Sequence, residues 1–374
     1  MISDKLKKRY NAFWDHEAAD GCLMYVEADG ENMLDANSQM LDGGEEQFAS
    51  MTEEEREAAK LKRNWTDVDY RVKLEKLRTS TTKYYGDAFP SVFTNFGPGS
   101  LSACIGGGFD LAPHTIWFDC NPIITDWENL PKIELDRNSE MWKLMDRFTR
   151  GLCENSNGGY HTSIADIGGT LDIIASLRGS QTLLYDMYDY HDEVQALIEK
   201  IKPMWIDTYN HLADIIFAHN DGMTSWQPLW CKDRYYPLQC DFSAMISPDM
   251  FDDLVLPDLK WQTEFLDHSI YHLDGPGELP HLDSILSLPR LDAIQWVPGA
   301  GLPDVMDEDW FEMYDKIQAA GKNLVLFVGE PDSDKTERCL NRLKSTKGVF
   351  VFVRAQDCKQ AEELVAIAEA VGVK

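Results

Sequence analysis

The chain alternates short β-rich runs with segments of helical pattern, and this alternation constrains its fold more than any other feature. Turn residues bound each run, and amphipathic segments such as His191–Phe217 separate the runs. Strands that alternate with helices predict βα units around a parallel sheet. The runs are Cys22–Glu27, Val92–Phe96, Thr162–Ile167, Met223–Gln227, Ile270–Asp274, Ala293–Val297, Leu324–Val328 and Val349–Val353. Since they are enough for a closed barrel, we predict an α/β fold of the TIM-type (β/α)8 class.

The length of 374 residues fits one such barrel with insertions, so we expect a single domain over residues 1–374. Residues 28–90 break the alternation, with an acidic, Gly/Asn-rich start followed by the charged segment MTEEEREAAKLKRN. This pattern predicts a helical insertion after the first strand. It is either a lid over a site or a solvated decoration or dimer contact.

The charge of the chain restricts its partners. With 64 acidic and 35 basic residues, the formal net charge is −29, which repels nucleic acid and anionic membrane surfaces. The N-terminus lacks the apolar core of a signal peptide, and no apolar run approaches the ~20 residues of a membrane span. The cysteines form no close CxxC pair, which indicates reduced thiols. We expect a soluble cytoplasmic protein that acts on a small molecule.

Two predicted strands in the stretch from Ser269 to Gly301 end in polar or aromatic side chains. IYHLDG ends in His272 and Asp274, and AIQWVPGAG contains Gln295 and Trp296. Residues two apart on a strand point the same way, so His272 and Asp274 could bind one metal ion or form an acid/base pair. The sequence therefore predicts an enzyme site at this end of the barrel.

Other predicted strands end in further functional groups at the same rim. Glu330 could be a third metal ligand or a base, or only an acid at a helix N-terminus. Cys240 and Asp241 offer a thiolate and a carboxylate in a rim loop, although a structural cysteine is the alternative. Tryptophans near two strand ends are typical of a flat or cationic ligand. The additional rim candidates are Asn95, Asp166 and Trp226.

Four segments of the chain resemble the uroporphyrinogen decarboxylase superfamily. They are YHLDGPGELPHLDSILSLPRLDAIQWVPGAG, DIGGTLDIIASLRG, LQCDFSAMISPDMFDDLVLP and GKNLVLFVGE, and the resemblance covers residues 90–374. It implies an α/β barrel of one of two classes, the haem-pathway decarboxylases or the zinc-dependent methyltransferases. The decarboxylases carry an arginine-rich clamp near the N-terminus, whereas this chain has no arginine between Arg9 and Arg56.

The methyltransferase class implies a zinc site and a corrinoid. Its members carry His-x-Cys at the fifth strand, which His272 matches in part, because Asp274 replaces the cysteine. The resemblance then implies a zinc centre of His272, Asp274 and Glu330, with Cys240 as a further ligand. We expect methyl transfer from a small O- or N-methylated compound to a corrinoid on a separate protein, with Asp166 or Glu330 protonating the leaving group. The expected substrate-binding residues are Asn95, Trp226, Gln295 and Trp296.

Two other functions stay open at this point. A decarboxylase of a tetrapyrrole or another carboxylated substrate would work without a metal, and a ligand-binding barrel would catalyse nothing. The sequence also leaves open whether two copies of the chain form a homodimer.

Overall fold

The computed structural model describes residues 2–17, 21–30, 48, 50–119 and 121–372. Its largest sheet has seven strands in the order β2-β1-β11-β10-β9-β8-β7. Neighbouring strands are parallel except for β1 and β2, which are antiparallel. These strands are β1 (Leu23–Asp29), β2 (Thr82–Gly86), β7 (Tyr235–Leu238), β8 (His268–Asp274), β9 (Ala293–Val297), β10 (Asn323–Val328) and β11 (Val349–Arg354).

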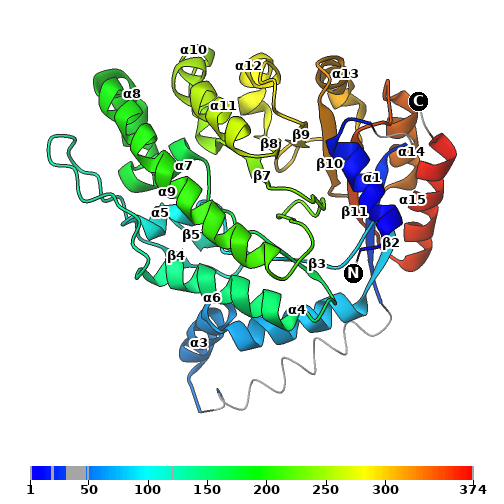
Figure 1. The fold of residues 1–374 in the computed structure, drawn as a ribbon, viewed down its shortest axis with the longest axis horizontal. Coiled ribbons are helices and arrows are strands. Elements are labelled where there is room, and N and C mark those ends of the chain that lie inside the picture. Colours follow the sequence, from blue (N-terminus) through cyan, green and yellow to red (C-terminus); the bar gives the residue numbers. More distant parts are fainter. Residues whose placement is uncertain (1, 18–20, 31–47, 49, 120, 373–374) are drawn as a thin grey trace.

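Helices follow most of these strands and lie along the outside of the sheet (Figure 1). β10 and β11 are buried along most of their length, as expected of parallel strands covered on both faces. The helices are α1 (Asp4–Trp14), α3 (Glu53–Thr66), α4 (Val68–Thr81), α5 (Leu101–Cys104), α6 (Glu140–Asn155), α7 (Thr170–Arg178), α8 (Ser180–Asp189), α9 (His191–Phe217), α10 (Pro248–Met250), α11 (Leu256–Phe265), α12 (Leu282–Leu286), α13 (Phe311–Ala319), α14 (Ser333–Arg342) and α15 (Cys358–Val371).

The long amphipathic helix predicted from the sequence is confirmed by α9, with the predicted bounds. Helix α10 begins with a serine cap followed by proline, and the Ser247 hydroxyl accepts a hydrogen bond from the Met250 N–H at 3.3 Å. A π-helical turn, Phe251–Val255, then joins α10 to α11.

The closed barrel is not confirmed. In the described part of the chain the strands form an open sheet and two smaller ones, β3 with β6 in parallel and β4 with β5 antiparallel. Side-chain hydrogen bonds connect the large sheet to the segments around β3 and β6. The Tyr25 hydroxyl donates to the Phe89 carbonyl, and the Ser225 and Tyr235 hydroxyl oxygens lie 2.8 Å apart. The smaller strands are β3 (Ser91–Phe93), β6 (His161–Ser163), β4 (Asp110–Leu111) and β5 (Ile116–Trp117).

One predicted strand is wrong, and the sequence pattern missed β2, β4, β5 and β7, of which β7 matters most for the site. Residues 223–227 form no strand, because Met223 makes only an isolated bridge to Cys231. The actual strand is β7, which contains Pro237 and lies at the edge of the sheet. Proline cannot donate to a ladder hydrogen bond, so an edge position tolerates it and a sequence pattern discounts it.

The charged part of the insertion at residues 28–90 forms helices, as predicted. Thr52 caps α3 through a capping box with Glu55, and α4 follows directly. The acidic start, residues 31–47, lies outside the described residues, and its role as lid or interface stays a prediction. None of the described helices is long and apolar enough to cross a membrane.

Candidate metal and substrate site

The strand β8 brings His272 and Asp274 to one place. Both side chains point to the same face because they lie two residues apart on the strand, and His272 pairs with Gln295 in the register of β8 and β9. Their ligand atoms and a carboxylate oxygen of Asp241 all lie within 4.8 Å of one another. Asp241 begins the turn that follows β7. Three neighbouring side chains thus offer one imidazole and two carboxylates.

Two glutamines hold the His272 ring in place. The Gln295 Oε1 atom accepts hydrogen bonds from His272 Nδ1 at 2.6 Å and from Gln227 Nε2 at 2.5 Å. An Nδ1 that donates a proton leaves Nε2 with its lone pair. This is the tautomer that a histidine needs to bind a metal through Nε2, and outer partners of this kind orient metal-binding histidines.

A third carboxylate, that of Asp172 in the first turn of α7, lies next to this group. It accepts hydrogen bonds from the Phe242 N–H at 2.8 Å and the Asp241 N–H at 3.2 Å. Gly169 permits this approach, since a Cβ atom there would lie 2.1 Å from the Gln239 carbonyl oxygen. The glycine pair after β6 therefore brings the start of α7 against the turn that carries Asp241.

Asp166 is buried close to the same group. Its Oδ1 atom accepts hydrogen bonds from the Gly168 N–H at 2.8 Å and the Tyr236 hydroxyl at 3.2 Å. The pKa of Asp166 is raised to about 6 in total. Burial is the main cause and the charge of Asp241 contributes, while these hydrogen bonds lower the pKa. A carboxyl group with this pKa can hold and release a proton near neutral pH.

The acidic side chains in and around the cluster have raised pKa values. Burial raises the pKa of Asp172 to about 8 and of Glu278 to about 10, and Asp241 adds to both shifts. Burial also raises the pKa of Asp241, with His272 opposing and Asp274 adding to the shift. Among the described residues, no lysine or arginine is a main cause of these three pKa shifts. A divalent cation would offset the repulsion, and histidine with carboxylates is a donor set that zinc accepts.

An aromatic side chain lies beside the histidine. The half-buried Trp226 ring meets the His272 ring edge-on, with centroids 6.3 Å apart, and meets Tyr236 at 5.8 Å. Because Tyr236 also donates to Asp166, these rings link the buried acid to the histidine. Trp226, Gln295 and Asp166 thus lie around the group formed by Asp241, His272 and Asp274.

Four residues that the sequence suggested lie apart from this group. Cys240 is not one of the three grouped ligand residues. Its side chain is buried, and burial raises the pKa of the thiol well above the usual value. Glu330 is exposed, and its N–H donates to Asp304. Trp296 is buried against Trp310, with centroids 4.9 Å apart, one residue out of phase with Gln295. Asn95 accepts a hydrogen bond from the Gly97 N–H at 2.8 Å and so stabilises its own turn.

Sequence reasoning offered Asp241 as a carboxylate in a rim loop but did not include it in the metal ligand set. Because strand β7 was not recognised, the position of Asp241 just beyond a strand end was hidden. Asp172 and Gln227 come from a helix and a loop, and their nearness to the histidine depends on contacts that no local pattern reports. The glycine pair was the one available signal, because adjacent glycines permit close backbone approach.

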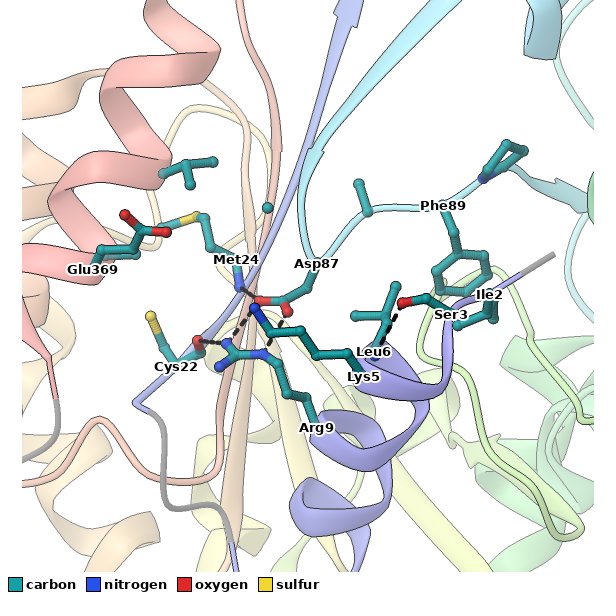
Figure 2. Close-up of a pocket in the computed structure, with 15 residues that line it drawn as sticks. Ile2, Ser3, Lys5, Leu6, Arg9, Cys22, Met24, Asp87, Phe89 and Glu369 are labelled. Carbon is teal, nitrogen blue, oxygen red and sulfur yellow. Dashed lines mark hydrogen bonds and ion pairs between the residues drawn. The ribbon is translucent and has the colours of Figure 1, made fainter.

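A cavity of about 460 Å³ lies at the amino end of β1, away from the group of Asp241, His272 and Asp274 (Figure 2). Arg9 and Asp87 form an ion pair in it: Arg9 Nε donates to Asp87 Oδ1 at 2.6 Å, and Arg9 Nη2 donates to Asp87 Oδ2 at 2.9 Å and to the Cys22 carbonyl at 2.9 Å. The Met24 N–H donates to the same carboxylate at 2.8 Å. These bonds tie α1 to β1 and the turn after β2, so this end has a structural role.

A comparison with known structures identifies a protein of similar fold. A methyltransferase from Methanosarcina mazei superposes with a TM-score of 0.60 over 98% of this chain and 98% of its own, at 11% sequence identity. Models of protein families give no match, and neither do curated protein sequences. At this identity the likeness establishes a shared fold.

Proposed function

We propose that the chain is a metal-dependent methyltransferase that moves a methyl group from a small O- or N-methylated compound to a corrinoid on a separate protein. One observation carries the proposal: Asp241, His272 and Asp274 converge, with uncompensated negative charge, in a chain that shares the fold of a methyltransferase. The shared fold supports the proposal by analogy, and the residues of the site support it by their chemistry.

The residues that would hold the metal are Asp241, Asp274 and His272 through Nε2. Zinc is the ion that the resemblance implies, and this donor set fits it. When bound, the ion supplies Lewis acidity towards the heteroatom that carries the methyl group. Gln295 keeps the imidazole oriented and in the tautomer that leaves Nε2 without a proton.

The remaining side chains have roles around the reacting group. Trp226 offers an aromatic face beside His272 that can hold the body of the substrate and exclude water. Asp166, with a pKa of about 6, can give a proton to the heteroatom as the methyl group leaves. The bond between carbon and heteroatom breaks, and its electron pair stays on the heteroatom, which takes this proton.

The same cluster disfavours the decarboxylase alternative. A polycarboxylated substrate would meet the carboxylates of Asp241 and Asp274, and no lysine or arginine is a main described cause of the pKa shift of Asp241. Arg9, the one arginine near the start of the chain, is engaged with Asp87 at the other end of the sheet. A polyanion lacks a cationic clamp at this site.

The test is metal content by elemental analysis, on protein purified without added metal or a metal-binding tag. We expect near-stoichiometric zinc in the native chain and its loss in His272→Ala. His191→Ala is the matched control, since His191 pairs with Asp253 and lies outside the metal group. Full metal content and full methyl transfer to a corrinoid in His272→Ala would refute the proposal.

A further inference from the structure

A small cavity opens beside Asp241, next to the proposed metal group. It has a volume of about 240 Å³ and lies between β5, α7 and the turn Asp241–Met245. This is below the roughly 300–1,000 Å³ of pockets for drug-sized ligands, so it suits a small molecule or one end of a larger one. Of the residues given a role in the proposed function, only Asp241 lines this cavity.

The ionisable side chains that line the cavity are all acidic. Asp119, Asp172 and Asp241 line it, and its described lining includes no lysine, arginine or histidine. Carboxylates in a cleft with low-dielectric walls focus a negative potential, which concentrates cations. A neutral or anionic ligand would gain nothing from this charge.

The rest of the lining is largely apolar and aromatic. Trp117 at the exposed edge, with the buried Phe118 and Phe242, presents aromatic rings, and the exposed Met245 contributes a thioether. Aromatic faces attract organic cations through the ring quadrupole. A bare inorganic cation instead requires a full shell of oxygen ligands, which such a wall cannot supply.

We propose that this cavity binds an organic ammonium ion, and that the substrate of the enzyme is a small organic cation. The ammonium group lies among the rings and carboxylates, and the rest of the molecule extends past Asp241 towards His272. The binding claim stands on the cavity alone. The claim that the bound cation is the methyl donor rests on the proposed function.

The first experiment compares charged and neutral ligands of the same shape by calorimetric titration. We expect saturable binding of tetramethylammonium and choline, and much weaker binding of 3,3-dimethylbutan-1-ol, in which a carbon replaces the nitrogen of choline. Potassium chloride at equal ionic strength should not compete. Equal affinity for choline and its neutral analogue, or no saturable binding at millimolar concentration, overturns the proposal.

Variants then test the lining. Phe242→Leu should weaken choline binding by roughly 5–30-fold, the range that a desolvated cation–π contact supports. Because Phe242 is buried and its loss could impair folding, Asp119→Asn at an exposed lining position provides an independent test. Its matched control is Asp110→Asn, an exposed aspartate outside the cavity. Equal weakening by the lining and control variants contradicts the assignment.

The metal-free His272→Ala protein separates this inference from the proposed function. If choline binds that protein while no metal or methyl transfer is found in the native chain, the cavity assignment stands and the proposed function fails. If the native chain binds zinc and demethylates uncharged donors but does not bind choline, the cavity assignment alone fails.

Discussion

Acidic side chains at the two ends of the parallel sheet differ in how they are partnered. At the amino end of β1, Asp87 receives two hydrogen bonds from Arg9 and one from the Met24 N–H. At the carboxyl ends of β7 and β8, Asp241 and Asp274 lie close together, and among the described residues His272 is the basic side chain that lowers the pKa of Asp241. Charge that the chain neutralises by itself holds elements together, whereas charge that it leaves uncompensated favours a ligand of opposite sign.

The strongest test of this contrast is Arg9→Ala. We expect the free energy of unfolding to fall by about 3–5 kcal/mol, because the change leaves a buried carboxylate without its partner. Zinc content should stay unchanged in the folded protein. Urea denaturation measures the loss, with Lys132→Ala as control, since Lys132 and Glu134 form an exposed pair 2.8 Å apart. A loss no larger than that of the control would remove the structural role of the amino-end pair.

The strand β6 allows the same contrast to be tested by pH. Burial lowers the pKa of His161, at its start, to about 4, and burial raises the pKa of Asp166, just beyond its end, to about 6. Between pH 4 and pH 6.5 the unfolded state binds more protons at His161 than the folded state does. The free energy of unfolding therefore falls as the pH falls through this range. Between pH 3.8 and pH 6 the folded state binds more protons at Asp166 than the unfolded state does. The free energy of unfolding therefore falls as the pH rises through this range.

Each effect amounts to at most about 3 kcal/mol, since one pKa unit corresponds to about 1.4 kcal/mol. We expect His161→Gln to gain stability relative to the native chain as the pH falls from 6.5 towards 4. Asp166→Asn should gain relative stability as the pH rises from 3.8 towards 6. Urea denaturation across this range measures both. Parallel pH profiles for a variant and the native chain would show that the group titrates normally.

The sequence predicted the parts of this arrangement that local pattern controls. His-x-Asp at the end of an apolar run was sufficient to identify His272 and Asp274, because side-chain direction alternates along a strand. Asp241 was noted as a rim carboxylate but left out of the metal ligand set, because β7, which contains Pro237, was not recognised as a strand. Closure of the sheet is not confirmed, since residues 223–227 make only an isolated bridge. Contacts such as that of Asp172 with the Phe242 N–H depend on tertiary structure, which periodicity cannot report.

Gln295→Leu tests whether the carboxyl end is organised for a metal. The substitution removes the oxygen that fixes the His272 tautomer, at 2.6 Å from Nδ1, while leaving all the proposed ligands present. Loss of such an outer partner typically weakens metal affinity by about 10–100-fold. Competition with a chromophoric chelator measures this. The control is Gln318→Leu, whose amide donates to the Ser345 carbonyl. Unchanged affinity would mean that Gln295 is only a packing residue.

The smallest effect is expected for Cys240→Ala, which distinguishes the sequence-derived ligand set from the structural one. Cys240 and Asp241 are neighbours, and only the aspartate belongs to the metal group. Burial keeps the Cys240 thiol protonated, and a thiol must lose its proton to bind zinc. We therefore expect zinc affinity to change by less than about twofold in Cys240→Ala and to be largely lost in Asp241→Asn, measured by the same chelator competition. The reverse order would mean that the turn after β7 rearranges on binding and that the thiol enters the site. In that case the uncompensated charge of Asp241 would no longer explain why a metal binds at this end of the sheet.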